Sequence, residues 1–324
     1  MKVRIHMELK NLIKTGGVVT AYRNRIKACT YGGIEIVDSD DFDILQAEFP
    51  GIESLLLSKS AKRREKAVVF ATHITAEDFQ DTFVFGKAIS PYLRKYLKMI
   101  YSAGDALISP SEYTKNLLRK YGINRPVYIL SNGIDPKFLK DANRKRKEGD
   151  EFVIGCVGFV TKRKGVLTFA NLAKRFPEFT FRWVGDIRKN LLFDVEKLKG
   201  IPNLQFTGYA KDIRKEYEKF DVFLFPSYEE NQGIVLLEAG AYSLPLIVRD
   251  IPVYEGWLRN RENCIKCSTD KDFEKALEEI IDNKDLREKL SRNSRKLAEQ
   301  HSLEIIGKKL RKIYEEVLSS NSSM

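Results

Sequence analysis

Short apolar runs of β type alternate with helical stretches along nearly the whole chain. This alternation is typical of parallel sheets whose strands are joined by helices, so the sequence predicts an α/β fold. At 324 residues the chain exceeds the usual size of one domain, and two units of about 150 residues each are expected. A hydrophobic content of 43% is that of an ordinary globular chain and is enough for two cores.

The predicted elements separate into two series at a polar segment, 137–150, which lacks apolar periodicity and indicates a linker. We predict one Rossmann-like domain over 1–147 and a second over 148–302, with a C-terminal helix at about 303–320 packing back on the first. The predicted strands are 3–7, 34–37, 44–47, 67–72, 106–109 and 127–130 in the first domain, and 152–157, 180–184, 204–207, 222–225 and 246–248 in the second.

The charge, hydropathy and cysteine content indicate the kind of partner and the cellular location to expect. A net charge of +11 favours an anionic partner, although a solvated, charge-rich surface explains it equally well. The chain shows no signal-peptide pattern and no apolar run long enough to cross a bilayer, so a cytoplasmic location, at most at the inner face of the membrane, is expected. Cys29, Cys156, Cys264 and Cys267 are too few and too scattered for a disulfide framework. The last two have the CxxC spacing of metal sites, but a zinc site needs a second pair or nearby histidines, so plain packing is expected.

The stretch 225–239 carries the most informative pattern. A buried strand is predicted to end at Pro226, an acidic loop follows, and Gly233 opens a helix. The first amides of a helix have no intrahelical acceptor and can bind phosphate oxygens. The amides predicted to do so are those of Gly233, Ile234 and Val235.

Two glutamates bracket this predicted helix start. Glu230 lies in the loop, where it can accept hydrogen bonds from sugar hydroxyls, and Glu238 lies inside the helix, where it can accept from two ribose hydroxyls. The alternative is structural: Glu230 would only stabilise the helix dipole, and Glu238 would be a solvated helix residue. The whole stretch, however, resembles the donor site of the family 4 retaining glycosyltransferases, in which two glutamates with seven residues between them, the second followed by alanine, occupy this setting.

The loop 158–165 follows the first predicted strand of the second domain and offers cations that can neutralise a leaving diphosphate. Lys164, before Gly165, matches the family lysine. The arginine that usually follows the first glycine is replaced by Phe159, so we assign its role to Arg163. A solvated basic loop is the alternative.

Two further matches lie in the first domain. Gly16 and Gly17 follow the first predicted strand, and adjacent glycines let the backbone approach a phosphate or sugar closely. His73 follows an apolar strand at the position where the resembled family places a histidine that contacts the transferred sugar. The segment 132–135 matches the family's crossover between domains and is expected to be structural.

The resemblance covers almost the whole chain, and one branch is closer than the rest. The segments 73–79, 228–239 and 249–258 resemble the diacylglycerol glucosyltransferases that build membrane glycolipids. This resemblance implies a GT-B fold, two Rossmann-like domains facing across a cleft. It also implies a nucleotide diphosphate sugar donor, UDP-glucose, and a lipid acceptor.

The segment 89–101 agrees with a membrane acceptor. Drawn as a helix, it places apolar and aromatic residues beside Arg94, Lys95 and Lys98, as helices at an anionic membrane surface do. An ordinary amphipathic helix packed on the sheet is the alternative.

The expected reaction is transfer with retention, in which the acceptor hydroxyl enters from the face that the diphosphate leaves. No carboxylate is convincingly placed as a nucleophile. The aspartates of 38–43 are interpreted as a turn, and the cations of Arg163 and Lys164 make an obligatory metal unnecessary. Three other classes stay open: a glycosyltransferase for a soluble or polysaccharide acceptor, a nucleotide-sugar epimerase, and a nucleic-acid-binding protein, for which no recognition module is found.

Overall fold

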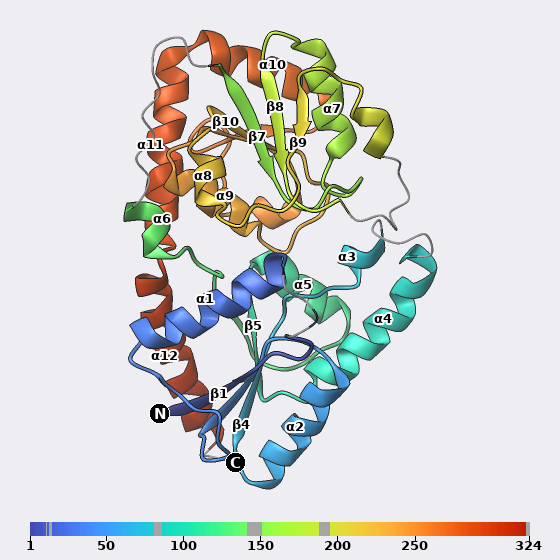
Figure 1. Cartoon of the computed structure of the whole chain (residues 1–324). Coiled ribbons are helices and arrows are strands. Elements are labelled where there is room, and N and C mark those ends of the chain that lie inside the picture. The colour runs from blue at the N-terminus through green and yellow to red at the C-terminus, as the bar shows by residue number, and fades with distance from the viewer. Residues whose placement is uncertain (11, 13–14, 81–85, 141–150, 188–194, 322–324) are drawn as a thin grey trace. The chain divides into compact units, whose positions relative to one another are not determined.

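The computed structural model describes residues 1–321 except 11, 13–14, 81–85, 141–150 and 188–194. The chain forms two compact units (Figure 1). Unit 1 contains the described residues of Met1–Gln80, Phe85–Asp135 and His301–Met324, and unit 2 contains those of Pro136–Gln300. The chain therefore changes unit at Asp135 and Gln300, whereas the sequence placed the changes at 147 and 302.

The described residues of unit 1 form a parallel sheet of six strands in the order β2-β1-β3-β4-β5-β6, which agrees with the predicted α/β class. All six strands were predicted to within a few residues. They are β1 (Lys2–His6), β2 (Glu35–Ile36), β3 (Ile44–Ala47), β4 (Ala67–Ala71), β5 (Ala106–Ser109) and β6 (Val127–Ile129). The helices are α1 (Gly17–Tyr31), α2 (Ile52–Arg63), α3 (Glu77–Gln80), α4 (Gly86–Tyr101), α5 (Glu112–Lys120) and α12 (Leu303–Asn321).

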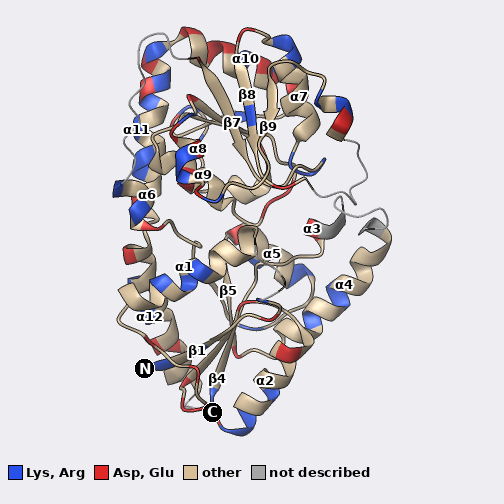
Figure 2. Cartoon of the chain, in the orientation of Figure 1, with Lys and Arg blue, Asp and Glu red and all other residues tan. Residues whose placement is uncertain are grey.

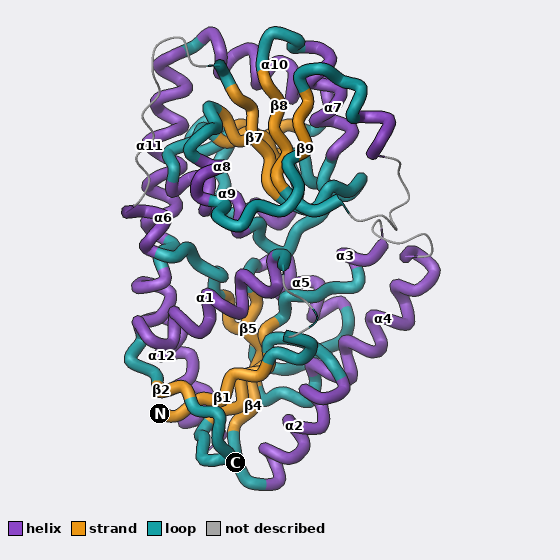
Figure 3. Tube along the Cα trace, viewed as in Figure 1, coloured by secondary structure: helices purple, strands orange, loops and turns teal. Residues whose placement is uncertain are grey.

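Helices cover both faces of this sheet (Figure 3), which is why strands such as β4 are apolar at every position. Val69 packs with α1 and α12 on one face, and Val68 and Phe70 pack with α4 and α5 on the other. α1 and α12 approach so closely that a Cβ on Gly307 would lie 2.3 Å from the carbonyl oxygen of Ala28. Only glycine fits there, and the C-terminal helix is thereby part of the core of unit 1.

The described residues of unit 2 form a second parallel sheet of six strands, in the order β12-β11-β10-β7-β8-β9. The strands are β7 (Val153–Val157), β8 (Thr180–Val184), β9 (Leu204–Phe206), β10 (Val222–Phe225), β11 (Leu246–Arg249) and β12 (Ile265–Cys267). The helices are α6 (Pro136–Lys140), α7 (Val166–Arg175), α8 (Arg214–Tyr217), α9 (Ile234–Ala241), α10 (Asp270–Asp282) and α11 (Lys284–Gln300), with short 3₁₀ turns η1 (Val195–Leu198) and η2 (Pro252–Tyr254).

Two local features of unit 2 differ from what the sequence suggested. The predicted linker begins with a helical turn, α6, and its remainder, 141–150, lies outside the described residues. The CxxC segment contains the edge strand β12, which was not predicted because it is only three residues long. Cys264 and Cys267 are buried, and burial raises the pKa of both thiols to about 12, which suits packing.

Each sheet has one point where the strand order reverses. In unit 1 this switch point lies between β1 and β3, and in unit 2 it lies between β10 and β7. Open α/β sheets bind their ligands beyond the carboxyl ends of the strands at such points, because the following connections diverge to opposite faces of the sheet. A ligand-binding site is therefore expected in the loops that follow these four strands.

Candidate functional site

At the switch point of unit 2, the loop 158–165 after β7 and the loop 226–233 after β10 interlock. Gly165 has a left-handed backbone, with φ of 80°, and a Cβ there would lie 2.3 Å from the carbonyl oxygen of Pro226. The amide of Tyr228 donates to the carbonyl of Arg163 at 2.8 Å, and Arg163 Nη1 donates to the carbonyl of Glu229 at 2.5 Å. These contacts hold the two loops against each other, and we call the paired loops 158–165 and 226–233 the loop surface of unit 2.

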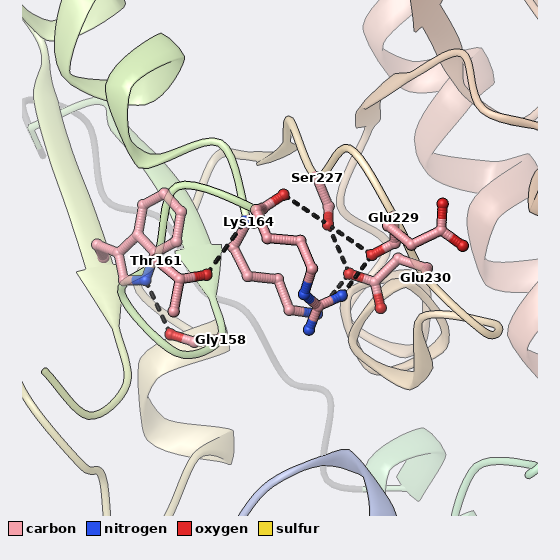
Figure 4. Close-up of polar contacts among 8 residues, drawn as sticks. Gly158, Thr161, Lys164, Ser227, Glu229 and Glu230 are labelled. Carbon is pink, nitrogen blue, oxygen red and sulfur yellow. Dashed lines mark hydrogen bonds and ion pairs between the residues drawn. The ribbon is translucent and has the colours of Figure 1, made fainter. Parts of the chain in front are cut away.

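Lys164 and Glu230 join the two loops through an ion pair (Figure 4). Glu230 also accepts a hydrogen bond from the hydroxyl of Ser227 at 2.7 Å, and Lys164 Nζ lies 5.1 Å from the centre of the Phe225 ring. Burial alone would raise the pKa of Glu230, but the charges of Lys164 and Arg163 outweigh burial and hold that pKa below its usual value. Glu230 is therefore a buried carboxylate that is ionised at neutral pH.

The same surface includes the start of α9. Gly233 precedes this helix in a left-handed conformation, with φ of 90°, which a residue with a side chain would adopt only with strain. The first intrahelical bond closes from the amide of Leu236 to the carbonyl of Gly233 at 3.0 Å. The amides of Gly233, Ile234 and Val235 hence lie in the first turn, where no intrahelical acceptor exists.

Glu238 is buried inside α9 rather than solvated, so the solvated interpretation of this residue is excluded. The hydroxyl of Tyr217 donates to Glu238 Oε2 at 2.7 Å. Burial raises the pKa of Glu238 to about 7, although the hydrogen bond from Tyr217 acts in the opposite direction. The charge of this carboxylate therefore changes near physiological pH.

At the switch point of unit 1, three buried side chains from different elements form a charged network. Arg25 of α1 donates through Nε to Glu48 Oε1 at 3.1 Å, and His73 Nε2 lies 2.7 Å from Glu48 Oε2. Burial would raise the pKa of Glu48, but Arg25 and His73 outweigh burial and lower that pKa. His73 is therefore held by a buried carboxylate that a guanidinium in turn neutralises.

Gly16 and Gly17 begin α1 at the same end of the sheet. Gly16 is the residue before the helix and has φ of 106°, which requires glycine. A Cβ on Gly17 would meet no heavy atom within 4 Å. The backbone at Gly17 is thus open to close approach by a ligand, although part of the preceding loop, 11 and 13–14, lies outside the described residues.

Acidic side chains elsewhere in unit 1 have structural partners. Asp40 pairs with Arg4 and Arg64, and Asp41 pairs with Lys2, as expected of a turn between strands. In the described part of the chain, one group of three side chains lies close enough to share a cation, with ligand atoms within 4.8 Å of one another: His6, Glu8 and Glu53. In that group Glu8 already accepts from the amide of Ser54 at the start of α2.

Sequence reasoning missed several residues of both networks. Glu48 follows β3 in the way that His73 follows the adjacent strand β4, so the neighbouring strand ends were a signal that could have found it. Arg25 lies in α1, Tyr217 ends the short helix α8, and Ser227 lies in a loop. Nothing in the local sequence pattern marks these three residues.

α4 has a mixed surface. Leu97 and Ile100 pack into the core of unit 1, while Tyr92 and Met99 are 74% and 53% exposed. Lys and Arg residues lie along the same helix (Figure 2), among them the exposed Arg94, Lys95 and Lys98. Among the helices of the described residues, none is long and apolar enough to cross a membrane.

Two parallel α/β units, with cations, glutamates and a helix start gathered at a switch point, define the GT-B class of glycosyltransferases. The chain belongs to glycosyltransferase family 4. The model "Glycosyltransferase Family 4" matches residues 17–138, and the model "Glycosyl transferases group 1" matches residues 138–297.

Similar proteins agree with this assignment. The processive diacylglycerol alpha-glucosyltransferase of Acholeplasma laidlawii is 32% identical over 98% of this chain and 99% of its own length. The alpha-galactosylglucosyldiacylglycerol synthase of Streptococcus pneumoniae is 33% identical over 77% of this chain and 72% of its own length. The crystal structure of Anabaena HepE in complex with UDP matches with a TM-score of 0.79, 13% identity and coverage of 98% and 100% of the two chains.

Proposed function

We propose that the protein is a retaining glycosyltransferase that transfers glucose from UDP-glucose to a hydroxyl of a membrane lipid. The observation that carries the proposal is the Lys164–Glu230 pair beside the start of α9, because it joins a cation for a diphosphate to a carboxylate for a sugar on one surface. The relatives named for diacylglycerol glucosyl transfer support the lipid acceptor, and the UDP-bound neighbour supports the donor. In this proposal unit 2 binds the donor and unit 1 the acceptor.

Arg163, Lys164 and the first amides of α9 hold the diphosphate. They stabilise the transition state because the bond from the anomeric carbon to the diphosphate oxygen breaks and its electron pair stays on that oxygen. The acceptor hydroxyl forms the new bond on the same face of the sugar, and its proton passes to the departing diphosphate. Fixed cations thus supply the charge stabilisation, so no metal is obligatory.

Three side chains orient the donor in this proposal. Glu230 accepts hydrogen bonds from sugar hydroxyls, and Glu238 accepts from the two ribose hydroxyls. His73 contacts the transferred sugar, held in place by Glu48. Gly16 and Gly17 leave room for substrate at the start of α1.

The decisive experiment incubates the purified protein with a panel of UDP-sugars and acceptors, namely diacylglycerol, glucosylated diacylglycerol and soluble sugars, and identifies products by mass spectrometry. The expected product is a lipid carrying an added glucose in α linkage, as read from the anomeric coupling constant by NMR. Transfer only to soluble sugars would contradict the proposal of a lipid acceptor. Conversion of the donor in the absence of any acceptor would indicate an epimerase.

Donor binding should depend on pH through Glu238. The ionised carboxylate accepts hydrogen bonds from both ribose hydroxyls, so binding should strengthen as pH rises through about 7. Between pH 6 and pH 8 the ionised fraction of a group with this pKa rises about tenfold, and the Kd for UDP-glucose should fall by up to the same factor. Isothermal titration calorimetry at several pH values measures this Kd. The diphosphate diester of the intact donor does not titrate in this range, so the donor itself does not contribute to the pH dependence.

The matched control is Glu238→Gln, which should bind UDP-glucose more weakly and with a flat pH profile. An unchanged pH dependence in this variant would remove Glu238 from the ribose site.

Binding to anionic vesicles should depend on α4. Each basic residue near an anionic leaflet contributes about 1 kcal/mol, so replacing Arg94, Lys95 and Lys98 by serine should weaken partition by roughly 100-fold. Sedimentation with vesicles of phosphatidylglycerol measures the effect. The control replaces Lys289, Arg292 and Lys296, exposed residues of α11, and an equal loss in both variants would show that net charge rather than α4 governs binding.

A further inference from the structure

Tyr254 ends the short turn η2, which follows β11, the strand next to β10. Its side chain is fully buried and packs edge-on against Trp257, with ring centres 5.8 Å apart. The hydroxyl points at the loop of the donor surface: it lies 3.7 Å from the position that a Cβ of Gly233 would occupy. Tyr254 thus lies directly beneath the loop 230–233.

The hydroxyl of Tyr254 has no hydrogen-bond partner among the described residues, although it is shielded from solvent. Two other fully buried tyrosines show the usual pairing: Tyr101 donates to the carbonyl of Ile74, and Tyr314 donates to Gln46 Oε1 at 3.0 Å. A buried hydroxyl without a partner destabilises the state in which it occurs, and phenylalanine would fill the same space without that cost. A state with a partner would explain the hydroxyl.

The Lys164–Glu230 pair shows how such a state arises. An anionic diphosphate competes with Glu230 for Lys164, since both are oxyanions that the same ammonium can bind. Once Lys164 turns to the diphosphate and Glu230 to the sugar, the loop 230–233 loses its ion pair with the loop 158–165, while the bonds between Arg163 and residues 228–229 remain. That loop contains carboxylate and carbonyl oxygens, which accept hydrogen bonds from a phenol.

We propose that Tyr254 is a positioning residue of the donor-bound state, in which its hydroxyl donates to an oxygen of the loop 230–233 and fixes Glu230 on the sugar. The inference rests on the proposed function, because a nucleotide sugar is the ligand that drives the change. It assigns Tyr254 a role in donor affinity that its buried position alone would not indicate.

The test is Tyr254→Phe, measured by thermal unfolding without ligand and by calorimetry with UDP-glucose. We expect the ligand-free variant to unfold at the wild-type temperature or above it, because no hydrogen bond is lost, while the Kd for UDP-glucose rises by about 3- to 30-fold. The matched control Tyr314→Phe removes a paired hydroxyl in unit 1 and should lower the unfolding temperature with an unchanged Kd.

A Tyr254→Phe protein that binds UDP-glucose as tightly as the wild type would overturn the inference, whatever its unfolding temperature. A fall in unfolding temperature with unchanged affinity would further show that the hydroxyl is bonded in the free protein. If the wild type itself binds no member of the UDP-sugar panel, the proposed function fails and this inference with it, so the two failures are distinguishable.

Discussion

Replacing Lys164 with methionine is expected to lower kcat for glycosyl transfer by about 100- to 1,000-fold, the usual effect of removing one preorganised group that stabilises developing charge. Methionine is an unbranched apolar side chain one atom shorter than lysine, and it loses the ammonium together with the contact that Nζ makes with the Phe225 ring. Steady-state kinetics at saturating UDP-glucose measure the effect on kcat separately from donor binding.

Loss of stability has to be separated from loss of catalysis in this variant, because Lys164→Met leaves Glu230 as a buried carboxylate without its cation. The double variant Lys164→Met with Glu230→Gln removes that charge and should recover stability without recovering kcat. The matched control Lys199→Met breaks an exposed pair with Glu196 and should change neither the stability nor kcat. A kcat close to the wild-type value in Lys164→Met would refute the assignment of this residue to the diphosphate.

Replacing Glu48 with glutamine should lower the free energy of unfolding by about 3–5 kcal/mol, because it leaves the buried guanidinium of Arg25 without a counter-charge. Urea unfolding at neutral pH measures the loss. The native pKa of Glu48 is depressed, so its stabilisation is present above the unfolded-state value of 4.5 and disappears as pH falls through the lower native value. The difference between variant and wild type should therefore shrink on acidification.

Two variants test the origin of this effect. Glu53→Gln changes a carboxylate that is 62% exposed and should cost less than about 1 kcal/mol. Adding Arg25→Met to Glu48→Gln removes both charges and should restore much of the lost stability. If the double variant is no more stable than Glu48→Gln, the buried pair is not the source of the loss. Because Glu48 also holds His73, activity should stay low in both Glu48 variants even where stability returns.

Many features of the loops 158–165 and 226–233 were predictable because their signals are local. A strand buried on both faces must be apolar throughout, which marked β4 and β10. The left-handed backbone at Gly165 and Gly233 demands glycine, so these residues mark the helix starts in the sequence itself. Lys164 and Glu230 were singled out because they lie within three residues of those glycines, in a pattern that resembles a known family, and their roles stay predictions.

Other parts depended on residues that are distant in the sequence. Arg25, Glu48 and His73 belong to α1 and to the ends of β3 and β4, and each alone looks like an ordinary polar residue. The strand β12 was missed because three residues carry no periodicity. These features appear only when the sheet brings the elements together.

By itself, the sequence determined the fold class, the described strands other than β12, and the loop residues whose backbone or charge has a local cause. Hydrophobic periodicity and glycine conformation act over a few neighbouring residues. The tertiary structure alone decided which charges are paired and how strongly they titrate. Burial and counter-charges that come from other elements lower the pKa of Glu48 and raise that of Glu238, because the cost of a charge depends on everything packed around it.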